Sequence, residues 1–371
     1  MVQVLHRIFS SSRSRSAQIG PEYAVLYASW SDAEGGDTMV YYAQRSRCLE
    51  CLRHFWRRLQ WPQVMALATL FGVYVFLQSP PLWFLHLVPA DIPRESIGSE
   101  RVLIVAPHPD DDILGVGSSI AAFRAEGIPV LVVFLTSGDA NLASKSLITM
   151  NPFSIAAEFR AVGTRRQKEA VVALGRLGVD PASAIFLNYP DSGLSSLLNN
   201  HWFAIDPFRS PYTRCTTKYS SVAFNPGSQY CGEGLLRDLM VIIGLFRPTT
   251  LYLPHPQDTH PDHCAGYTFV RMAVEELEAE NGDFVRPALR CYMVHSFADP
   301  WPTPSKVRNV LSLDLLDAFL ELGSWHTVPL TAQAIAAKYQ ALRAHASQWW
   351  ISSAFLGRFI CNNELYMVPD S

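Results

Sequence analysis

The sequence predicts an α/β protein with a mostly parallel sheet between two layers of helices, preceded by an N-terminal transmembrane helix. Three observations predict this architecture. Short apolar runs rich in β-branched residues alternate with helical stretches after about residue 100. Hydrophobic residues make up 49% of the chain and charged residues only 17%, which allows a large packed core. Finally, residues 59–90 contain no Asp, Glu, Lys or Arg.

Five apolar runs have the length and composition of buried strands: residues 101–106, 128–136, 184–188, 249–253 and 289–295. Four stretches have helical spacing: residues 114–125, 159–177, 234–246 and 264–278. Alternation of strands and helices favours parallel pairing, because each crossover returns the chain to the same edge of the sheet. In open sheets of this kind, ligands bind at the carboxyl ends of the strands.

The charge-free segment predicts a membrane anchor at residues 61–88. Its unbroken apolar part, residues 64–77, is short for a bilayer, which takes about 20 helical residues. Extension from Trp61 to Trp83 supplies length and places aromatic rings at interface depth, although two prolines at 80–81 are expected to break the helix. A buried core helix and a cleaved signal peptide are the alternatives.

The charges beside the anchor predict its orientation. Five arginines lie at positions 45–58, whereas acidic residues predominate at positions 91–100. The positive-inside rule then predicts a single-pass membrane protein with its N-terminus in the cytoplasm and its folded domain on the extracytoplasmic side. We therefore expect a disordered cytoplasmic region at 1–60, the anchor at 61–88 and one folded domain at 95–371.

A first polar cluster follows the first predicted strand and contains His108 and the aspartates 110–112. Adjacent carboxylates repel one another unless a cation or hydrogen-bond donors neutralise them. An imidazole and a carboxylate are also common ligands of catalytic zinc. Taken alone, the segment fits a solvated acidic loop equally well.

A second polar cluster, residues 255–263 (HPQDTHPDH), follows the fourth predicted strand. Three histidines and two aspartates within so short a segment are typical of a metal site. Because both clusters follow strands of one parallel sheet, we expect them to converge on one rim. Together they supply three ligands and leave coordination positions open, as a hydrolytic metal site requires.

Short sequence motifs in addition to the two clusters are spread over about residues 99–368. They are residues 106–111 (APHPDD), 136–138 (TSG), Arg166 and Glu169 with 177–179 (LGV), 190–194 (PDSGL), 260–263 (HPDH), Lys338 with 347–348 (SQ), and 363–365 (NEL). In these segments the chain resembles the PIG-L/LmbE family of de-N-acetylases. The resemblance implies a Rossmann-like three-layer α/β fold, with the last two segments in closing helices.

The resemblance implies a metal centre built from both clusters. His108, Asp111 and His263 would bind the metal. Zn²⁺ suits this mixed nitrogen and oxygen set, although Fe²⁺ or Mn²⁺ would also fit. A metal bound there would lower the pKa of a bound water towards about 7 and polarise an acetyl oxygen.

The same resemblance implies roles for the remaining site residues. Asp110 would be the general base that takes a proton from water. His260 would be a positively charged partner of the oxyanion or would protonate the departing amine, and Asp262 would orient it. Arg166 would contact the substrate.

The residues predict a hydrolytic metal site, and the resemblance implies a metal-dependent hydrolase that removes acetyl from an N-acetylglucosamine-type amino sugar or glycoconjugate. One alternative is a metal-dependent amidase that acts on a non-sugar acyl amine. Another is a non-catalytic sugar-binding module, whose signature would be the loss of a ligand or of the base. The formal net charge of −3 gives no sign of a nucleic-acid partner, so the expected partners are the glycoconjugate and the membrane.

Weaker candidates lie outside the two clusters. Asp139 and Asp191 follow predicted strands and His295 ends one, so each could line the pocket, with a structural role as the alternative. The irregular segment 202–230 is long enough for a lid or a binding loop.

Two positions depart from the family pattern: Asp112 stands where many members have Glu, and Cys361 where many have Arg. The first is a small change beside the proposed metal site, and the second lies outside that site. If the domain is exported, Cys215 and Cys231 could form a disulfide across one loop.

Overall fold

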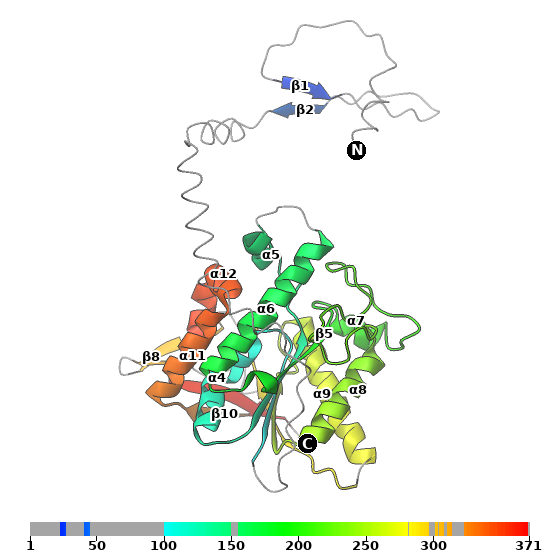
Figure 1. Cartoon of the computed structure of the whole chain (residues 1–371). Coiled ribbons are helices and arrows are strands. Elements are labelled where there is room, and N and C mark those ends of the chain that lie inside the picture. Colours follow the sequence, from blue (N-terminus) through cyan, green and yellow to red (C-terminus); the bar gives the residue numbers. More distant parts are fainter. Residues whose placement is uncertain are drawn as a thin grey trace, which may run out of the picture. The chain divides into compact units, whose positions relative to one another are not determined.

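The chain divides into two units, Met1–Ser79 and Pro80–Ser371, in the computed structural model. In the first unit the structure describes strands β1 (Tyr23–Leu26) and β2 (Tyr41–Gln44), which pair antiparallel. In the second it describes residues 100–149, 155–280, 282–296, 301–302, 304–307, 310–313 and 323–369 (Figure 1). The predicted anchor and the rest of the predicted disordered region lie outside the described residues. None of the described helices is long and apolar enough to cross a membrane.

Seven strands form one sheet in the second unit, in the order β10-β11-β7-β6-β3-β4-β5. Their bounds are β3 Val102–Ala106, β4 Val130–Thr136, β5 Ala184–Tyr189, β6 Thr250–Pro254, β7 Ala288–Tyr292, β10 Ser324–Pro329 and β11 Asn363–Val368. The strands from β7 to β5 pair in parallel, β11 pairs antiparallel with β7, and β10 pairs antiparallel with β11. Strands β8 (Pro304–Val307) and β9 (Val310–Leu313) form a separate antiparallel pair. The five predicted strands are the parallel ones, so the predicted α/β fold with a mostly parallel sheet is confirmed.

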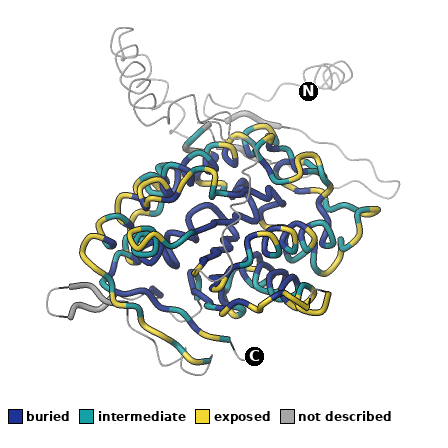
Figure 2. The backbone as a smooth tube through the Cα atoms, turned by 60° about the horizontal axis from the view of Figure 1, so that its bottom comes forward, coloured by how far each residue is buried: buried dark blue, intermediate teal, exposed yellow. Residues whose placement is uncertain are grey.

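Helices cover both faces of this sheet (Figure 1). Their bounds are α4 Asp111–Ala125, α5 Leu142–Thr149, α6 Ala156–Arg176, α7 Leu194–Asn199, α8 Gly232–Phe246, α9 Pro261–Glu280, α11 Ala332–Ala344 and α12 Ala346–Leu356. Alternate residues of β3 face opposite layers: Ile104 packs with α4, α6 and α11, and Leu103 packs with α8 and α9. Because both faces are covered, the central strands are apolar throughout and buried (Figure 2).

The antiparallel edge is the part of the sheet that the sequence does not predict. Residues 363–365, expected in a closing helix, begin strand β11 instead. The reason is that β11 lies between β10 and β7, which supply hydrogen-bonding partners for an extended backbone. Lys338 and residues 347–348, the other expected closing segment, do lie on helices, α11 and α12.

All four predicted helices begin earlier than predicted, and the first turns of two of them, α4 and α9, carry site residues. Helix α4 begins at Asp111 rather than residue 114, and α9 begins at Pro261 rather than residue 264. Proline is well suited to a first helical position, and acidic side chains are stabilised near a helix N-terminus. Since α4 follows β3 and α9 follows β6, and these strands are neighbours, both first turns lie at one edge of the sheet.

Residues 202–230 form an irregular loop, held to β5 by a bridge between Ala223 and Phe186. Cys215 and Cys231 are free, so the predicted disulfide is wrong. The two thiols have separate surroundings. Cys231 is buried at the start of α8, whereas the Cys215 thiol lies 3.6 Å from a backbone carbonyl two residues before it in a local turn.

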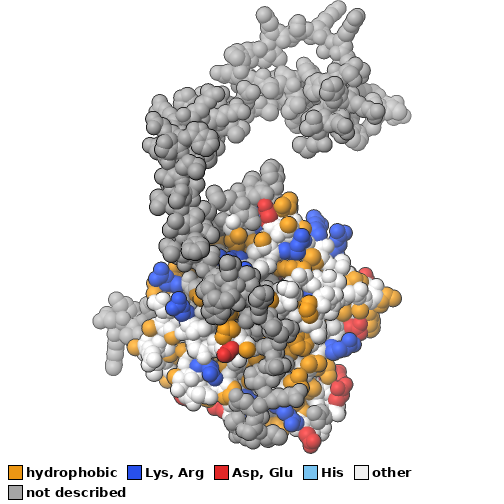
Figure 3. All heavy atoms as spheres, viewed as in Figure 1, with side chains coloured by type: hydrophobic (Ala, Val, Ile, Leu, Met, Phe, Trp, Pro, Cys, Tyr) orange, Lys and Arg blue, Asp and Glu red, His pale blue; other side chains and the backbone are white. Residues whose placement is uncertain are grey.

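Charged side chains of both signs are scattered over the face that Figure 3 shows, with hydrophobic side chains between them. The charged residues that are buried instead gather in a few places. The largest gathering is at the carboxyl edge of the sheet, and the others include two ion pairs, Lys218 with Asp238 and Lys338 with Glu364. Burial of charge without compensation is costly, so each gathering needs a physical explanation.

Candidate active site

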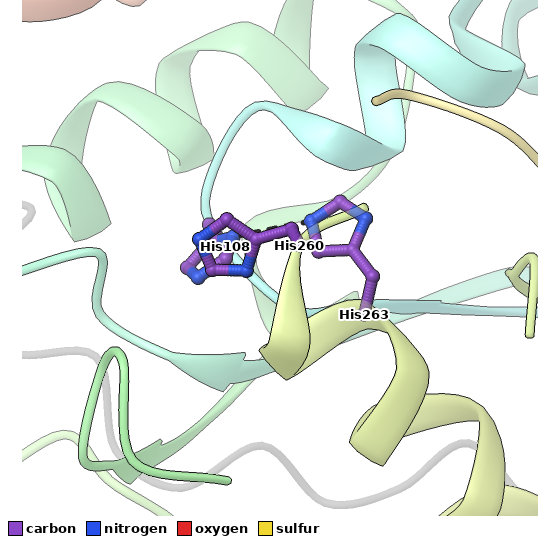
Figure 4. Close-up of side chains that lie close together, drawn as sticks. All are labelled: His108, His260 and His263. Carbon is purple, nitrogen blue, oxygen red and sulfur yellow. Dashed lines mark hydrogen bonds between the residues drawn. The ribbon is translucent and has the colours of Figure 1, made fainter. Parts of the chain in front are cut away.

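The two histidine clusters meet at the carboxyl edge of the sheet, as predicted. His108 lies in the loop between β3 and α4, and His260 and His263 lie at the start of α9. The ring centroid of His108 lies 4.6 Å from that of His260 and 5.4 Å from that of His263. Figure 4 shows the three rings gathered in one place although they come from two segments of the chain.

The three predicted metal ligands present their donor atoms to one another. Nδ1 of His108 and Nε2 of His263 each lie 3.1 Å from Oδ2 of Asp111, and they lie 3.4 Å from each other. A cation bound at about 2.0–2.2 Å in a tetrahedral site keeps its ligand atoms roughly 3.3 Å apart. All three residues are buried. The triangle therefore has the size and the donor chemistry that a divalent transition-metal ion requires.

The electrostatics of this triangle also suit a cation. Burial alone would raise the pKa of Asp111, but His263 and His108 hold it well below its usual value. Burial alone would lower the pKa of His263, but Asp111 and Asp258 raise it to about 9. The carboxylates and the imidazoles thus stabilise each other when positive charge, here the protons on the histidines, lies between them. A metal cation can supply that charge in place of the protons.

Asp258 supports the second half of the triangle. Its Oδ2 lies 3.1 Å from Nδ1 of His263, an ion-pair contact that falls short of hydrogen-bond geometry. The same carboxylate accepts the backbone N–H groups of Val294, His295 and His260 at 2.9–3.1 Å. A carboxylate behind a metal-binding imidazole fixes the ring and its tautomer. The sequence contains Asp258 within the second cluster but does not indicate this role.

Asp110 pairs with Arg166 and has a strained backbone. Its φ of 137° lies in a region that non-glycine residues rarely adopt. The backbone N–H groups of Ile113 and Leu114 both donate to its carbonyl, and Arg166 donates to its Oδ1 at 3.1 Å. Burial raises the pKa of Asp110 to about 6 although Arg166 opposes that rise. Asp110 therefore has the geometry of a proton acceptor beside the triangle and not of a ligand in it.

Arg166 of α6 holds the turn that carries Asp110. Its guanidinium donates to the carbonyls of Gly138 and Pro109 at 2.9 and 2.7 Å, in addition to Asp110. A side chain at residue 138 would collide with this guanidinium, because a Cβ there would lie 2.0 Å from Nη1. All three of these hydrogen bonds go to the protein itself. Substrate contact by Arg166, which also lines the cavity described below, stays a prediction.

His260 is neutral at neutral pH, which differs from the positive partner that the sequence suggested. Burial and the neighbouring His108 and His263 lower its pKa to about 4. Its Nδ1 accepts the backbone N–H of Asp262 at 3.2 Å, so the ring proton resides on Nε2. His260 can therefore act as a neutral hydrogen-bond donor through Nε2–H.

The Asp262 side chain does not reach the ring of His260. Its carboxylate accepts the backbone N–H groups of Ser192 and Leu194 at 2.7 and 3.0 Å, and it lies 3.4 Å from Nε2 of His108. Only the backbone amide of Asp262 contacts His260. The carboxylate instead ties the loop before α7 to His108, so it positions a predicted ligand and not the predicted oxyanion donor.

A cavity of about 280 Å³ opens beside these residues. One wall holds the polar site residues, and the opposite wall comes from α12 and the loop before α5, through Asn141, Gln348, Ser352 and Phe355. Two of the weaker candidates, Asp191 and His295, also line it. Asp139 does not; its carboxylate is buried and accepts the Tyr219 hydroxyl at 2.8 Å.

The loop at 202–230 is not the lid that the sequence suggested, since none of its described residues lines this cavity. It packs instead behind the site, where Tyr219 reaches Asp139 and the backbone N–H of Ser220 donates to Asn188. The sequence did not indicate the wall formed by α12. Helix α12 reaches the cavity because α11, which follows β10, packs against α4 and α6, and α12 then packs against α5 and α6.

Comparison with known proteins points to one family. The PIG-L family, described as GlcNAc-PI de-N-acetylase, matches residues 103–274. A 1D-myo-inositol 2-acetamido-2-deoxy-alpha-D-glucopyranoside deacetylase of Mycobacterium sp. (strain KMS) is 27% identical, covering 77% of this chain and 86% of that protein. The enzyme of the same description from Streptomyces griseus is 26% identical, with 73% and 81% covered. Among solved structures, the N,N'-diacetylchitobiose deacetylase from Pyrococcus horikoshii is 18% identical, with 73% and 84% covered and a TM-score of 0.44.

Proposed function

Because residues 103–274 form a domain of the PIG-L family, we propose that this de-N-acetylase is metal-dependent and removes the acetyl group from an N-acetylglucosamine-type sugar or glycoconjugate. The observation that carries the proposal is the triangle of donor atoms from His108, Asp111 and His263, with Asp110 beside it and outside it. The mycobacterial relative, named as a 1D-myo-inositol 2-acetamido-2-deoxy-alpha-D-glucopyranoside deacetylase, supports the sugar class.

The donor set fits a divalent cation held by His108, Asp111 and His263. Zn²⁺ suits two imidazoles and one carboxylate, and Fe²⁺ or Mn²⁺ also accept this set. When bound, such an ion supplies Lewis-acid chemistry: it polarises the acetyl carbonyl and acidifies water. Asp258 and Asp262, behind the two imidazoles, keep the rings in the orientation that binding requires.

Asp110 accepts the proton of the attacking water. A base works best when its pKa lies near the operating pH, and burial raises the pKa of this carboxyl to about 6. Arg166 fixes the carboxylate and the strained turn before it, so the acceptor oxygen is in place before substrate arrives. The proton then passes to the departing amine, so that the products are acetate and a free amino sugar.

His260 stabilises the oxyanion as a neutral donor. Its Nδ1 accepts the backbone N–H of Asp262, so the ring proton lies on Nε2, where it can be donated to substrate. A preorganised donor aimed at charge that develops only in the transition state contributes about 100- to 1,000-fold to kcat. The ring lies against His108, which keeps the donor next to the proposed cation.

The cavity suits one amino-sugar ring. Its apolar part comes from Leu114, Phe355 and Leu356, and its polar part includes Asn141 and Ser352. Sugars present apolar ring faces and polar edges, and binding sites of this kind combine apolar walls with a few placed polar groups. A larger glycoconjugate would extend beyond the cavity, whose volume is about 280 Å³.

We further propose that residues 61–88 anchor the enzyme in a membrane with its catalytic domain on the extracytoplasmic side. The support is the charge-free apolar segment and the arginines that precede it. A reporter active only outside the cytoplasm, fused to the C-terminus, should be active. Activity of a cytoplasm-only reporter at the same position would contradict this orientation.

Acetate release by the purified full-length chain tests the proposed reaction. We expect turnover of N-acetylglucosamine conjugates, loss of turnover after chelation, and recovery when Zn²⁺, Fe²⁺ or Mn²⁺ is restored. Elemental analysis of the purified protein identifies the bound metal. Release of acetate only from non-carbohydrate amides would leave a hydrolase but reject the sugar substrate. A chain with neither metal nor turnover would favour the sugar-binding module.

A further inference from the structure

Helix α4, which begins with the predicted ligand Asp111, is broken one turn after its start. Val116 has φ −139° and ψ 19°, far from helical values, so the first turn and the remainder are two separate helical segments. In an unbroken helix, the N–H groups of Ser118 and Ser119 would donate to the carbonyls four residues before them. A break inside a buried helix leaves backbone groups that need other partners.

A buried ion pair from the C-terminal part of the chain supplies those partners. Glu364 of β11 accepts the N–H groups of Ser118 and Ser119 at 2.8 and 2.9 Å and the Ser119 hydroxyl at 2.6 Å. Lys338 of α11 donates to the Leu114 carbonyl at 2.9 Å and to Glu364 at 2.8 Å. The carboxylate thus caps the second segment of α4, and the ammonium caps the first.

Close packing leaves the break little freedom. A Cβ at Gly115 would lie 2.5 Å from the Tyr292 ring, and one at Gly117 would lie 3.2 Å from the Lys338 side chain. Lys338 and Glu364 are buried, so water cannot easily replace either of them. The first turn of α4 therefore has one direction relative to β3 and β7, and the ion pair holds it.

We infer that Lys338 and Glu364 are positioning residues for the metal centre. They belong to the C-terminal segments that resemble PIG-L/LmbE proteins but lie beyond residues 103–274, where the match to the PIG-L family ends, and neither lines the cavity. They act through the first turn of α4, whose direction determines where Asp111 lies relative to His263. The C-terminal segment thereby completes the site without contributing a ligand. This inference rests on the proposed metal-dependent function.

The test compares two buried ion pairs in the full-length protein. Glu364→Gln and Lys338→Met keep the shape of each side chain and remove its charge. Asp238→Asn is the matched control, because Asp238 lies on α8, which covers the opposite face of the sheet, and pairs with the buried Lys218 of the loop at 202–230. The readouts are Zn²⁺ and Co²⁺ affinity by competition with a chelator, the Co²⁺ absorption spectrum, and the thermal midpoint.

We expect Glu364→Gln and Lys338→Met to weaken metal binding by about 10- to 100-fold, as changes behind metal ligands do, and to alter the Co²⁺ spectrum. In activity assays, kcat should fall with little change in KM. Asp238→Asn should lower the thermal midpoint while its metal affinity stays within about twofold of wild type, because distant sites act independently. If both variants kept wild-type metal affinity and a wild-type Co²⁺ spectrum, and only their thermal midpoint fell as in the control, the ion pair would have a purely structural role.

Ser119→Ala covers the case in which the charge-removing variants do not fold. It deletes only the hydroxyl contact to Glu364. A several-fold loss of metal affinity in this variant supports positioning, and wild-type affinity overturns it. Wild-type protein is measured first: if it binds no metal, the proposed function itself fails, whereas unchanged affinity in the variants rejects only the positioning role.

Discussion

Two clusters of buried charge in the same domain differ in how well the protein satisfies them. The first, which we call the pinning cluster, consists of Lys218, Asp238, Tyr189 and Asn225. Lys218 donates to Asp238 and to the carbonyl of Phe224, while the Tyr189 hydroxyl and the Asn225 amide donate to the same carboxylate at 2.9 and 2.7 Å. Each charged group in it has an opposite charge or a donor, and the cluster holds the loop at 202–230 against α8.

The second, the site cluster, consists of His108, Asp110, Asp111, Asp112 and His263. Within the part of the chain that the structure describes, both carboxylate oxygens of Asp112 and Nδ1 of His263 lack a hydrogen-bond partner. Burial and the charge of Asp110 raise the pKa of Asp112 well above its usual value. The backbone at Asp110 is strained as well.

This difference in hydrogen-bond satisfaction distinguishes buried charge that stabilises the fold from buried charge at a site where a ligand is expected to bind. Buried polar groups are normally satisfied, and a set that is not satisfied is expected where a ligand completes it. The pinning cluster is complete without any addition. In the site cluster, the proposed cation would add positive charge among the carboxylates, although it would bind Nε2 of His263 and not the unpaired Nδ1.

His263→Ala should produce the largest effect, because it removes one corner of the donor triangle. We expect loss of the bound metal and turnover at background level, since a catalytic site with two protein ligands no longer holds its metal. Elemental analysis and acetate release measure the two losses. His255→Gln, a change at an equally buried histidine of the same segment, is the control and should retain metal. Metal retained at wild-type stoichiometry in His263→Ala would show that the triangle is not the site.

Asp110→Asn should retain the metal and lose most of the chemistry. General-base catalysis contributes about 100- to 10,000-fold, so we expect kcat to fall by that factor with the metal content unchanged. Steady-state kinetics together with elemental analysis separates this variant from the ligand variant. Wild-type turnover in Asp110→Asn would mean that the base is another residue.

The sequence predicted the parallel core and the site residues for a physical reason. Strands buried on both faces are continuous apolar runs, so β3, β4, β5, β6 and β7 stand out. Strand β10 was not predicted because it is largely exposed and its sequence, SWHTVP, contains no continuous apolar run. Helix α7, with six residues, is too short for a periodic pattern to appear.

The supporting contacts of the site could not be predicted, because they join segments that are distant in sequence. Glu364 reaches Ser118 across 246 positions, and Asp258 holds a strand end 36 positions away. The charge state of His260 depended on burial among other histidines, which no local motif indicates. Residue types and the family resemblance therefore predicted candidate ligands and a candidate base, while the relative orientation of these side chains required the fold.

Asp238→Asn tests the other side of the comparison. Removing one partner of a buried ion pair leaves the other uncompensated, so we expect a loss of about 3 kcal/mol in the free energy of unfolding. Metal content and kcat should stay at wild-type values because the pinning cluster does not touch the site. Denaturant unfolding and acetate release measure the two properties. A loss of metal with no loss of stability would show that the two clusters are not independent.

Arg166→Met should shift a pH profile, and the direction of that shift follows from the charges around Asp110. The base is active when deprotonated, so the acidic limb of kcat against pH rises as Asp110 loses its proton. Arg166 lowers the pKa of Asp110, which burial raises to about 6, so removing the guanidinium must raise that pKa further. We expect the acidic limb to move up by about one pH unit or more.

The pH at which the acidic limb lies is independent of the maximal kcat. This distinction matters because Arg166 also holds the strained turn, and loss of that contact could lower kcat by itself. A lower kcat alone would be explained by a displaced turn, but a shifted limb reports the charge that faces the base. Arg165→Met is the matched control: Arg165 is the adjacent arginine, and it pairs with Glu169 instead of Asp110. Its limb should stay in place. If the limb of Arg166→Met also stays in place, Arg166 does not act on the catalytic base through its charge, and the direct substrate contact predicted from the family becomes the better account of this residue.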